Sequence, residues 1–263
     1  MSDKPVSENY PDFVARTGQV NTPPGSYDTL KLWIREGFIS NNSELLEIGC
    51  TTGFIANQLS RYTGAKTTGI DLSSVAIGKA REHSLSNEMV SFEVGDAGDL
   101  PYSDETFSHV VIGGHLPWVP YDVRKEHVQE AVRVLKPNGF LLTSLYHFVT
   151  EPPEKLVSDF NDAFNTQLSA KGDLESWDSL FRLPNLHLEF NQDYKVRPPS
   201  AKRLDDYVGE FDETLRPAWR EKANLLAENG EHLGFFVRVY QKLSPDDPYI
   251  QTPRGGIYTW ERI

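Results

Sequence analysis

Short strand-like runs recur along the first 145 residues of the chain and are separated by segments with helical spacing. The runs lie at 45–48, 66–71, 89–94, 107–112 and 140–145. Between the last two runs, the apolar positions over 123–135 recur with the period of an amphipathic helix. Alternation of strands and helices is typical of a parallel sheet with right-handed crossovers. The pattern therefore predicts an α/β fold with a Rossmann-like, doubly wound sheet.

The chain departs from this alternation before and after the core. Residues 1–40 include a predicted helix at 27–37 and are expected to form a helical N-terminal lid. About 80 residues, 151–232, are too many for a loop in a compact domain, so an inserted substrate cap is expected there. The cap is predicted to hold helices at 154–168, 201–212 and 218–229 and a candidate strand at 186–190.

Two later segments have the composition of strands. We expect 233–242 and 256–263 to pair as an antiparallel C-terminal hairpin, which would complete a sheet of about seven strands. The expected organisation is thus a lid, a cofactor-binding core over 41–150, a cap, and the C-terminal strands of the core sheet over 233–263.

The first strand runs directly into a glycine turn. Gly49 and Gly53 let the backbone approach a ligand closely, and helical spacing resumes at Phe54. Because a helix amino terminus favours negatively charged groups, this turn is a candidate cofactor loop. Glu47 precedes Gly49 by two positions, and the glycine spacing differs from the G-x-G-x-x-G of dinucleotide-binding folds. Glu47, Gly49 and Gly53 are the expected cofactor contacts of this turn.

Acidic or glycine residues follow the carboxyl ends of the next three strands. Asp71 ends the second strand, 22 residues after Gly49, where a carboxylate can accept hydrogen bonds from both hydroxyls of a ribose. Asp96 follows the third strand, and Gly113 follows the fourth. Ligands of open α/β sheets bind at this edge, so the sequence predicts a nucleotide-like cofactor there.

Four motifs in this order resemble those of the class I S-adenosylmethionine-dependent methyltransferases, especially the small-molecule branch. They are Glu47–Gly53, Gly69–Ser73, Gly95–Ala97 and Val134–Phe140, within residues 40 to 145. Two positions depart from the family pattern. Thr51 replaces the middle glycine of the first motif, and Asn138 stands where a second glycine is usual before Phe140.

The resemblance implies S-adenosylmethionine as cofactor and adds further candidate contacts to it. Cys50 belongs to the first motif and Leu72 to the motif around Asp71, while Asp96 and Ala97 match the motif that contacts the adenine. Cys50 is the single cysteine, which excludes an internal disulfide and a zinc cluster. Its position allows a nucleophile or a small residue packed beside the ligand, and we favour the second interpretation.

Two histidines are candidate catalytic residues. Methyl transfer is an in-line displacement from a sulfonium, so the protein mainly positions the nucleophile and excludes water, and a base is optional. His115 follows Gly113 and Gly114 next to the expected methyl group, and could act as that base or only shape the loop. His147, after the fifth strand, is the second candidate.

Aromatic residues near the same edge are candidate substrate contacts. Trp118 could stack on a planar or cationic substrate or anchor its loop, and Tyr146 follows the fifth strand. The resemblance implies that a leading helix covers the cofactor, which makes aromatic residues of the N-terminal region lid candidates with packing as the alternative. These residues are Tyr10, Phe13, Tyr27 and Trp33, of which Tyr27 is the expected substrate contact.

Charge and hydropathy limit the classes of partner that the chain is expected to bind. The chain has 26 basic and 38 acidic residues and a formal net charge of −12, which disfavours nucleic acid and anionic membranes as partners. No segment resembles a signal peptide or a transmembrane span, so a soluble cytoplasmic protein is expected. No metal site is predicted, and formation of a homodimer is left open.

The predicted function is transfer of a methyl group from S-adenosylmethionine to a small-molecule acceptor. Oxygen or nitrogen nucleophiles are favoured over carbon because histidines flank the expected site. One alternative is a nicotinamide-dependent oxidoreductase, which the glycine spacing and Glu47 disfavour. The other is a non-catalytic S-adenosylmethionine-binding partner subunit.

Overall fold

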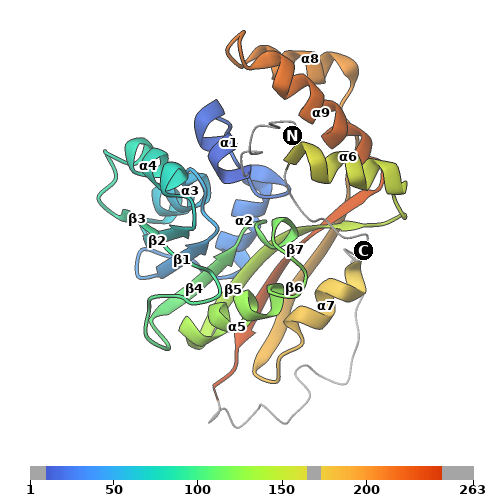
Figure 1. Ribbon diagram of the computed structural model, residues 1–263. Coiled ribbons are helices and arrows are strands. Elements are labelled where there is room, and N and C mark those ends of the chain that lie inside the picture. Colours follow the sequence, from blue (N-terminus) through green and yellow to red (C-terminus); the bar gives the residue numbers. More distant parts are fainter. Residues whose placement is uncertain (1–9, 165–172, 245–263) are drawn as a thin grey trace, which may run out of the picture.

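A seven-stranded sheet forms the centre of the molecule, with strand order β3-β2-β1-β4-β5-β7-β6 (Figure 1). The structure is a computed structural model that describes residues 10–164 and 173–244. Its strands are β1 (Glu44–Ile48), β2 (Lys66–Asp71), β3 (Val90–Val94), β4 (Phe107–Ile112), β5 (Leu135–Phe148), β6 (Leu186–Lys195) and β7 (Leu233–Lys242). Its helices are α1 (Tyr10–Thr17), α2 (Ser26–Glu36), α3 (Phe54–Thr63), α4 (Ser74–His83), α5 (Arg124–Val134), α6 (Glu154–Phe164), α7 (Leu174–Phe181), α8 (Ala201–Gly209), α9 (Arg216–Gly230) and the 3-10 turn η1 (Leu116–Trp118).

The first five strands are parallel and the last two reverse direction. β1 pairs in parallel with β2 and β4, and four of its five residues are buried, as expected for a strand covered on both faces. β7 runs antiparallel to both β5 and β6. The predicted doubly wound sheet with antiparallel C-terminal strands is therefore confirmed.

The strand that pairs with β7 at the outer edge differs from the one we expected. It is β6, which starts at the candidate strand 186–190 and extends to Lys195. Residues 256–263, the expected hairpin partner, lie outside the described residues. The segment 151–232 thus contributes an edge strand to the core sheet as well as helices. Its division into a separate cap stays a prediction.

Helices cover both faces of the sheet. α2 and α3 pack on one face, where Leu30, Trp33 and Leu59 are fully buried with apolar residues of β1, β4 and β7. α5 and α7 cover the other face, where Val128 and Trp177 belong to a second apolar cluster. The sequence pattern did not predict α7. These two layers hold the strand ends, and hence the loops after them, in fixed positions.

Four helices, α1, α6, α8 and α9, lie on one side of the core and contact one another there (Figure 1). Phe13 of α1 packs at 5.0 Å from Trp219 of α9, in a small apolar cluster with Val208 of α8. α6 contacts α9, and α1 also contacts α4 of the core. α1 therefore connects the core to the helices of residues 151–232.

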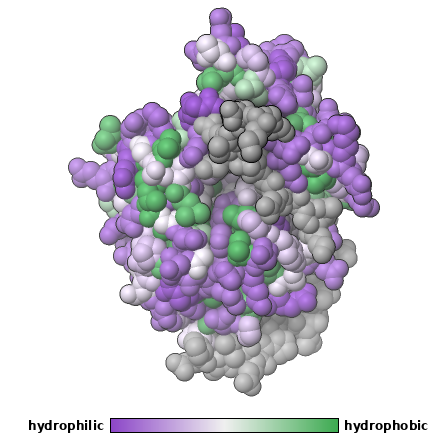
Figure 2. Space-filling model, in the orientation of Figure 1, coloured by the Kyte–Doolittle hydropathy of each residue, from purple (hydrophilic) through white to green (hydrophobic). Residues whose placement is uncertain are grey.

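Hydrophilic residues dominate the face of the molecule shown in Figure 2, and hydrophobic residues appear there in small groups. This distribution agrees with the strongly acidic composition. Among the described residues, every helix is too short or too polar to traverse a lipid bilayer.

Candidate functional site

The loop between β1 and α3 makes a sharp turn at the carboxyl end of β1. The backbone N–H groups of Gly49 and Cys50 both donate to the carbonyl oxygen of Ile70, at 2.9 and 3.1 Å. Gly49 has a φ of +71°, and a Cβ atom there would lie 2.5 Å from the Cβ of His115. The conformation and the contact with His115 thus both require glycine at this position.

Thr51 occupies the left-handed region, with a φ of +44°. This backbone conformation explains why the resembling family has glycine here, because a threonine in it costs about 1–3 kcal/mol. The Thr51 side chain accepts a hydrogen bond from Asn21 Nδ2 at 3.2 Å. Asn21 lies in residues 18–22, the segment between α1 and α2 that we call the strap. The departure from the family pattern therefore ties the strap to the glycine loop.

Asp71, the predicted ribose contact, holds the same loop from the end of β2. Its Oδ2 accepts from the N–H of Thr51 and its Oδ1 from the N–H of Ser73, both at 2.9 Å. Burial raises the pKa of the Asp71 carboxyl, and these two hydrogen bonds oppose that increase. Each carboxylate oxygen has a further lone pair, so Asp71 can accept two more hydrogen bonds from a ligand.

Glu47 caps the amino terminus of the adjacent helix, α3. Its Oε2 accepts a hydrogen bond of 2.8 Å from the N–H of Ala56, in the first turn of α3. The residue that precedes this helix, Gly53, provides no side-chain cap, so the strand supplies one instead. Burial raises the pKa of Glu47 to about 8, which makes this carboxyl largely protonated at neutral pH.

Glu47, Thr51 and Asp71 line a cavity of about 530 Å³. The loops after β1, β2, β3 and β4 form one half of this cavity, which we call the strand-edge half. The cavity brings together nine of the predicted site residues: Glu47, Gly49, Asp71, Leu72, Ala97, Gly113, His115, Trp118 and Tyr146. Its volume lies within the range typical of small-molecule sites.

Five predicted residues do not line this cavity. Cys50 is buried beside Ala56 and Phe92, and Gly53 packs against Phe92. Asp96 is exposed, and its Oδ1 accepts from the N–H of Gly98 at 2.8 Å. The two residues that flank Asp96 line the cavity in its place.

Tyr27 and His147 are the other two predicted site residues that do not line the cavity. Tyr27 packs edge-on against Phe54 at 5.5 Å, away from the cavity. His147 is 7% exposed and stacks on Phe236, whereas its neighbour Tyr146 is 42% exposed and lines the cavity. Successive residues of a strand point to opposite faces, so β5 directs only one of this pair toward the site.

His115 lines the cavity, and its ring faces another histidine. Its Nε2 lies 3.3 Å from Nδ1 of His127, and the two rings stack with centroids 5.5 Å apart. Burial and the neighbouring His127 lower the pKa of His115 to about 3. The imidazole is therefore neutral at physiological pH and a weak proton acceptor.

The other half of the cavity, which we call the aromatic half, is formed largely by residues that the sequence did not single out as substrate contacts. The aromatic half comprises Tyr10, Trp118, Tyr146, Phe164, Tyr207 and Leu226. Tyr10 stacks in parallel on Trp118, with centroids 4.1 Å apart, and contacts Phe164 edge-on. Of the aromatic lid candidates, Tyr10 reaches the cavity, whereas Phe13 and Trp33 are buried in apolar clusters.

Comparisons with known proteins agree with the geometry. Residues 45–139 match a family model described as a methyltransferase domain. An uncharacterised protein of Haemophilus influenzae is 30% identical over 177 residues, which are 65% of this chain and 69% of that protein. The chain belongs to the S-adenosylmethionine-dependent methyltransferases.

Two further relatives support this membership in the methyltransferase family. The demethylmenaquinone methyltransferase of Staphylococcus aureus is 33% identical over 124 residues, which are 44% of this chain and half of that enzyme. The crystal structure of the MccD protein superimposes with a TM-score of 0.74 and 26% identity, covering 84% of this chain and all of that one. The nicotinamide-dependent oxidoreductase and the non-catalytic partner subunit are thereby set aside.

The strand-edge half fits the cofactor of the methyltransferase family. Asp71 has free lone pairs for two ribose hydroxyls, and a ligand there would supply the donors that its buried carboxylate lacks. Gly49, Gly95 and Gly113 also line this half of the cavity. The residues of the strand-edge half are therefore compatible with S-adenosylmethionine, the cofactor of the family.

Proposed function

We propose that this methyltransferase transfers the methyl group of S-adenosylmethionine to a nitrogen or oxygen atom of a small acceptor with an apolar or planar body. The observation that carries the proposal is the continuity of the strand-edge half with the aromatic half in one cavity. A donor held at Asp71 and an acceptor packed against Tyr10 and Trp118 would thus share one cavity.

The chemistry of the lining supports this class of acceptor. Among the described residues, no lysine or arginine lines the cavity, so the site offers no fixed cation to an anionic acceptor. Rings of Tyr10, Trp118 and Tyr146 instead offer π faces and apolar area. A planar ring or an amine cation would pack favourably against these faces.

The residues of the chain position the reactants. The cofactor supplies a methyl group on a positively charged sulfonium, which is an excellent leaving group. Asp71 would orient the ribose through charge-assisted hydrogen bonds, and Gly49 and Gly113 would line the space beside it. α1, α6, α8 and α9 contribute side chains to the aromatic half and would limit the access of water to the site.

We further propose that neither His115 nor Tyr10 acts as a general base. The pKa of His115 is about 3, and burial raises the pKa of Tyr10, so neither group accepts a proton readily at neutral pH. The proposed acceptor therefore presents its lone pair without help from these two groups, as an uncharged amine or an acidic phenol does. His115 shapes the loop beneath the cofactor, which is the alternative role that the sequence left open.

Labelled methyl transfer tests this function. The protein is incubated with S-adenosylmethionine that carries an isotopic methyl label and with fractionated metabolite extracts, and products are identified by mass spectrometry. We expect the label on nitrogen or oxygen of a small aromatic or amine-bearing molecule. Label on a carbon atom, or on a strongly anionic acceptor, would contradict the proposal.

A further inference from the structure

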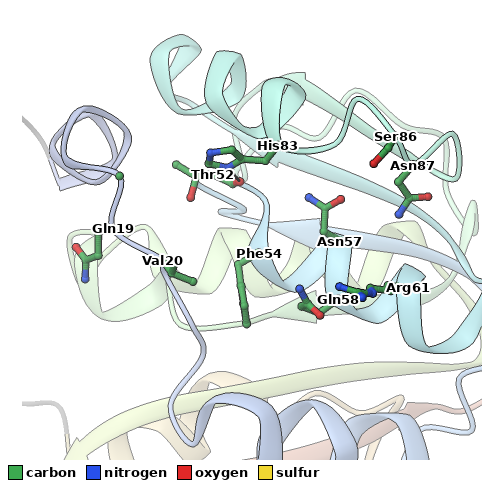
Figure 3. A pocket seen from close by; sticks show the side chains of 11 residues that line it. Gln19, Val20, Thr52, Phe54, Asn57, Gln58, Arg61, His83, Ser86 and Asn87 are labelled. Carbon is green, nitrogen blue, oxygen red and sulfur yellow. Dashed lines mark hydrogen bonds between the residues drawn. The ribbon is translucent and has the colours of Figure 1, made fainter. Parts of the chain in front are cut away.

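A second cavity, of about 660 Å³, lies on the other side of the strap from the cofactor site. Figure 3 shows Gln19 and Val20 of the strap across from Thr52 and His83, with Arg61 farther along α3. Polar side chains of α3 and of the loop after α4 complete the wall. We call this space the outer cavity.

The charges of the outer cavity differ from those of the whole chain. Acidic residues outnumber basic ones by 38 to 26 over the sequence, yet no aspartate or glutamate lines the outer cavity among the described residues. Its ionisable side chains are Arg61 and His83. Within residues 10–164 and 173–244, Arg61 makes no ion pair or hydrogen bond, whereas Arg133, for example, is bound by two carboxylates. The Arg61 guanidinium is thus available to a ligand.

We propose that the outer cavity binds a small molecule that carries a carboxylate or phosphate group. A guanidinium presents a planar fork of donors that matches either group. Gln58 and Ser86 line the same cavity and supply neutral donors for the remaining oxygens. This site lies apart from the methyl acceptor and does not depend on which atom is methylated.

The outer cavity and the cofactor site share two walls. Gln19 and Val20 of the strap line both cavities. In the glycine loop, Thr51 lines the cofactor site and Thr52, the next residue, lines the outer cavity. The strap and the loop are joined by the hydrogen bond from Asn21 to Thr51, and Thr51 in turn donates its N–H to Asp71. Contacts in the outer cavity therefore act on the groups that hold the cofactor.

The expected consequence is positive coupling between the two sites. An anion bound by Arg61, at the end of the outer cavity away from the strap in Figure 3, would fix α3, which begins directly after the glycine loop. The cofactor would then bind to an already ordered loop. Coupling of this kind typically changes affinity by about 5- to 150-fold, and it is reciprocal. We expect an increase of at least about fivefold in cofactor affinity, at the low end of this range.

Calorimetry of S-adenosylhomocysteine binding tests the proposal. The full chain is titrated in chloride, in inorganic phosphate and in succinate at equal ionic strength, and the two anions separate a phosphate ligand from a carboxylate ligand. The same titrations are made with Arg61→Gln, which removes the charge of an exposed side chain. The matched control is Arg35→Gln, the same substitution at an exposed arginine of α2 that lines neither cavity.

We expect phosphate or succinate to lower the Kd of S-adenosylhomocysteine at least fivefold in the wild type and in Arg35→Gln, but not in Arg61→Gln. In chloride, all three proteins should bind S-adenosylhomocysteine equally. Equal anion effects in all three proteins, or no effect of either anion in the wild type, would overturn the proposal. A failure of methyl transfer with intact anion coupling would instead refute only the proposed function.

Discussion

The strand-edge half and the aromatic half of the cavity are built in different ways. The strand-edge half comes from loops that directly follow β1 to β4, and its groups are held by backbone hydrogen bonds such as those of Asp71. The aromatic half comes from α1, η1, β5, α6, α8 and α9, and side-chain stacking holds it together. Under the proposed function, backbone geometry would fix the cofactor, whereas exchangeable side chains would define the acceptor.

This difference predicts that substitutions in the two halves affect different constants. Changes in the strand-edge half should weaken cofactor binding, and changes in the aromatic half should raise the KM of the acceptor. Substitutions that alter both constants together would show that the halves do not act separately.

The largest effect is expected at Asp71. Asp71→Asn keeps a side chain of similar size but removes the charge that would hold the ribose, at a cost of about 1.5–3 kcal/mol in cofactor binding. Calorimetry should show S-adenosylhomocysteine binding about tenfold to a hundredfold weaker. Asp96→Asn is the control, because its exposed carboxylate lies outside the cavity and should lose much less. Equal losses for the two variants would refute the assignment of the ribose to Asp71.

A smaller effect is expected at Tyr10, in the aromatic half. Tyr10→Ala removes the ring stacked on Trp118, and an aromatic pair contributes about 0.5–1.5 kcal/mol. Once an acceptor is known, its KM should rise about two- to tenfold, with unchanged affinity for S-adenosylhomocysteine. Tyr27→Ala tests the residue that the sequence predicted as a substrate contact. Because Tyr27 packs outside the cavity, we expect its variant to retain the wild-type KM.

His115→Asn should affect turnover only modestly. A pKa of about 3 keeps His115 neutral from pH 5 upward, so the wild-type rate should show no inflection from this group between pH 5 and 8. We expect turnover to fall only a few-fold, without rescue at higher pH. A loss of a hundredfold or more that alkaline buffer partly restores would establish His115 as the base and disprove our interpretation.

The last prediction concerns stability and not binding or rate, and it rests on Glu47 in the strand-edge half. Its pKa in the folded protein, about 8, lies above the ordinary value of 4.5, so the protein binds this proton more tightly when folded. The resulting stabilisation is complete below pH 4.5 and is lost as pH rises through about 8.

Thermal unfolding at a series of pH values measures this loss. The Tm of the wild type should fall more between pH 6 and 9 than the Tm of Glu47→Gln, by about 2–4 °C for each kcal/mol. Parallel Tm curves for the two proteins would mean that Glu47 is already ionised at neutral pH.

The strand-edge half could be predicted from the sequence because its residues lie next to the strands that position them. Gly49, Asp71 and Gly113 each follow a short apolar run, and parallel pairing brings the ends of such runs to one edge. The same reasoning could not separate Tyr146 from His147, because the sequence does not show which of two neighbours faces the site. A shift of one residue in the strand exchanges the two faces.

The aromatic half and the edge of the sheet could not be predicted in the same way. Phe164 and Tyr207 reach the cavity only through the packing of α6 and α8, and no local pattern encodes where those helices lie. β6 exposes polar residues along much of its length, so its place in the sheet follows from pairing with β7 and not from an apolar run. The low pKa of His115 likewise depends on burial beside His127, which lies 12 residues later in the sequence.

A crystal structure of the protein with S-adenosylhomocysteine would test the division of the cavity most directly. We predict that both ribose hydroxyls bond to Asp71 and that the sulfur atom faces the aromatic half near Tyr146 and Trp118. A ribose bound away from Asp71, or an adenine ring stacked within the aromatic half, would contradict the assignment of donor and acceptor to the two halves.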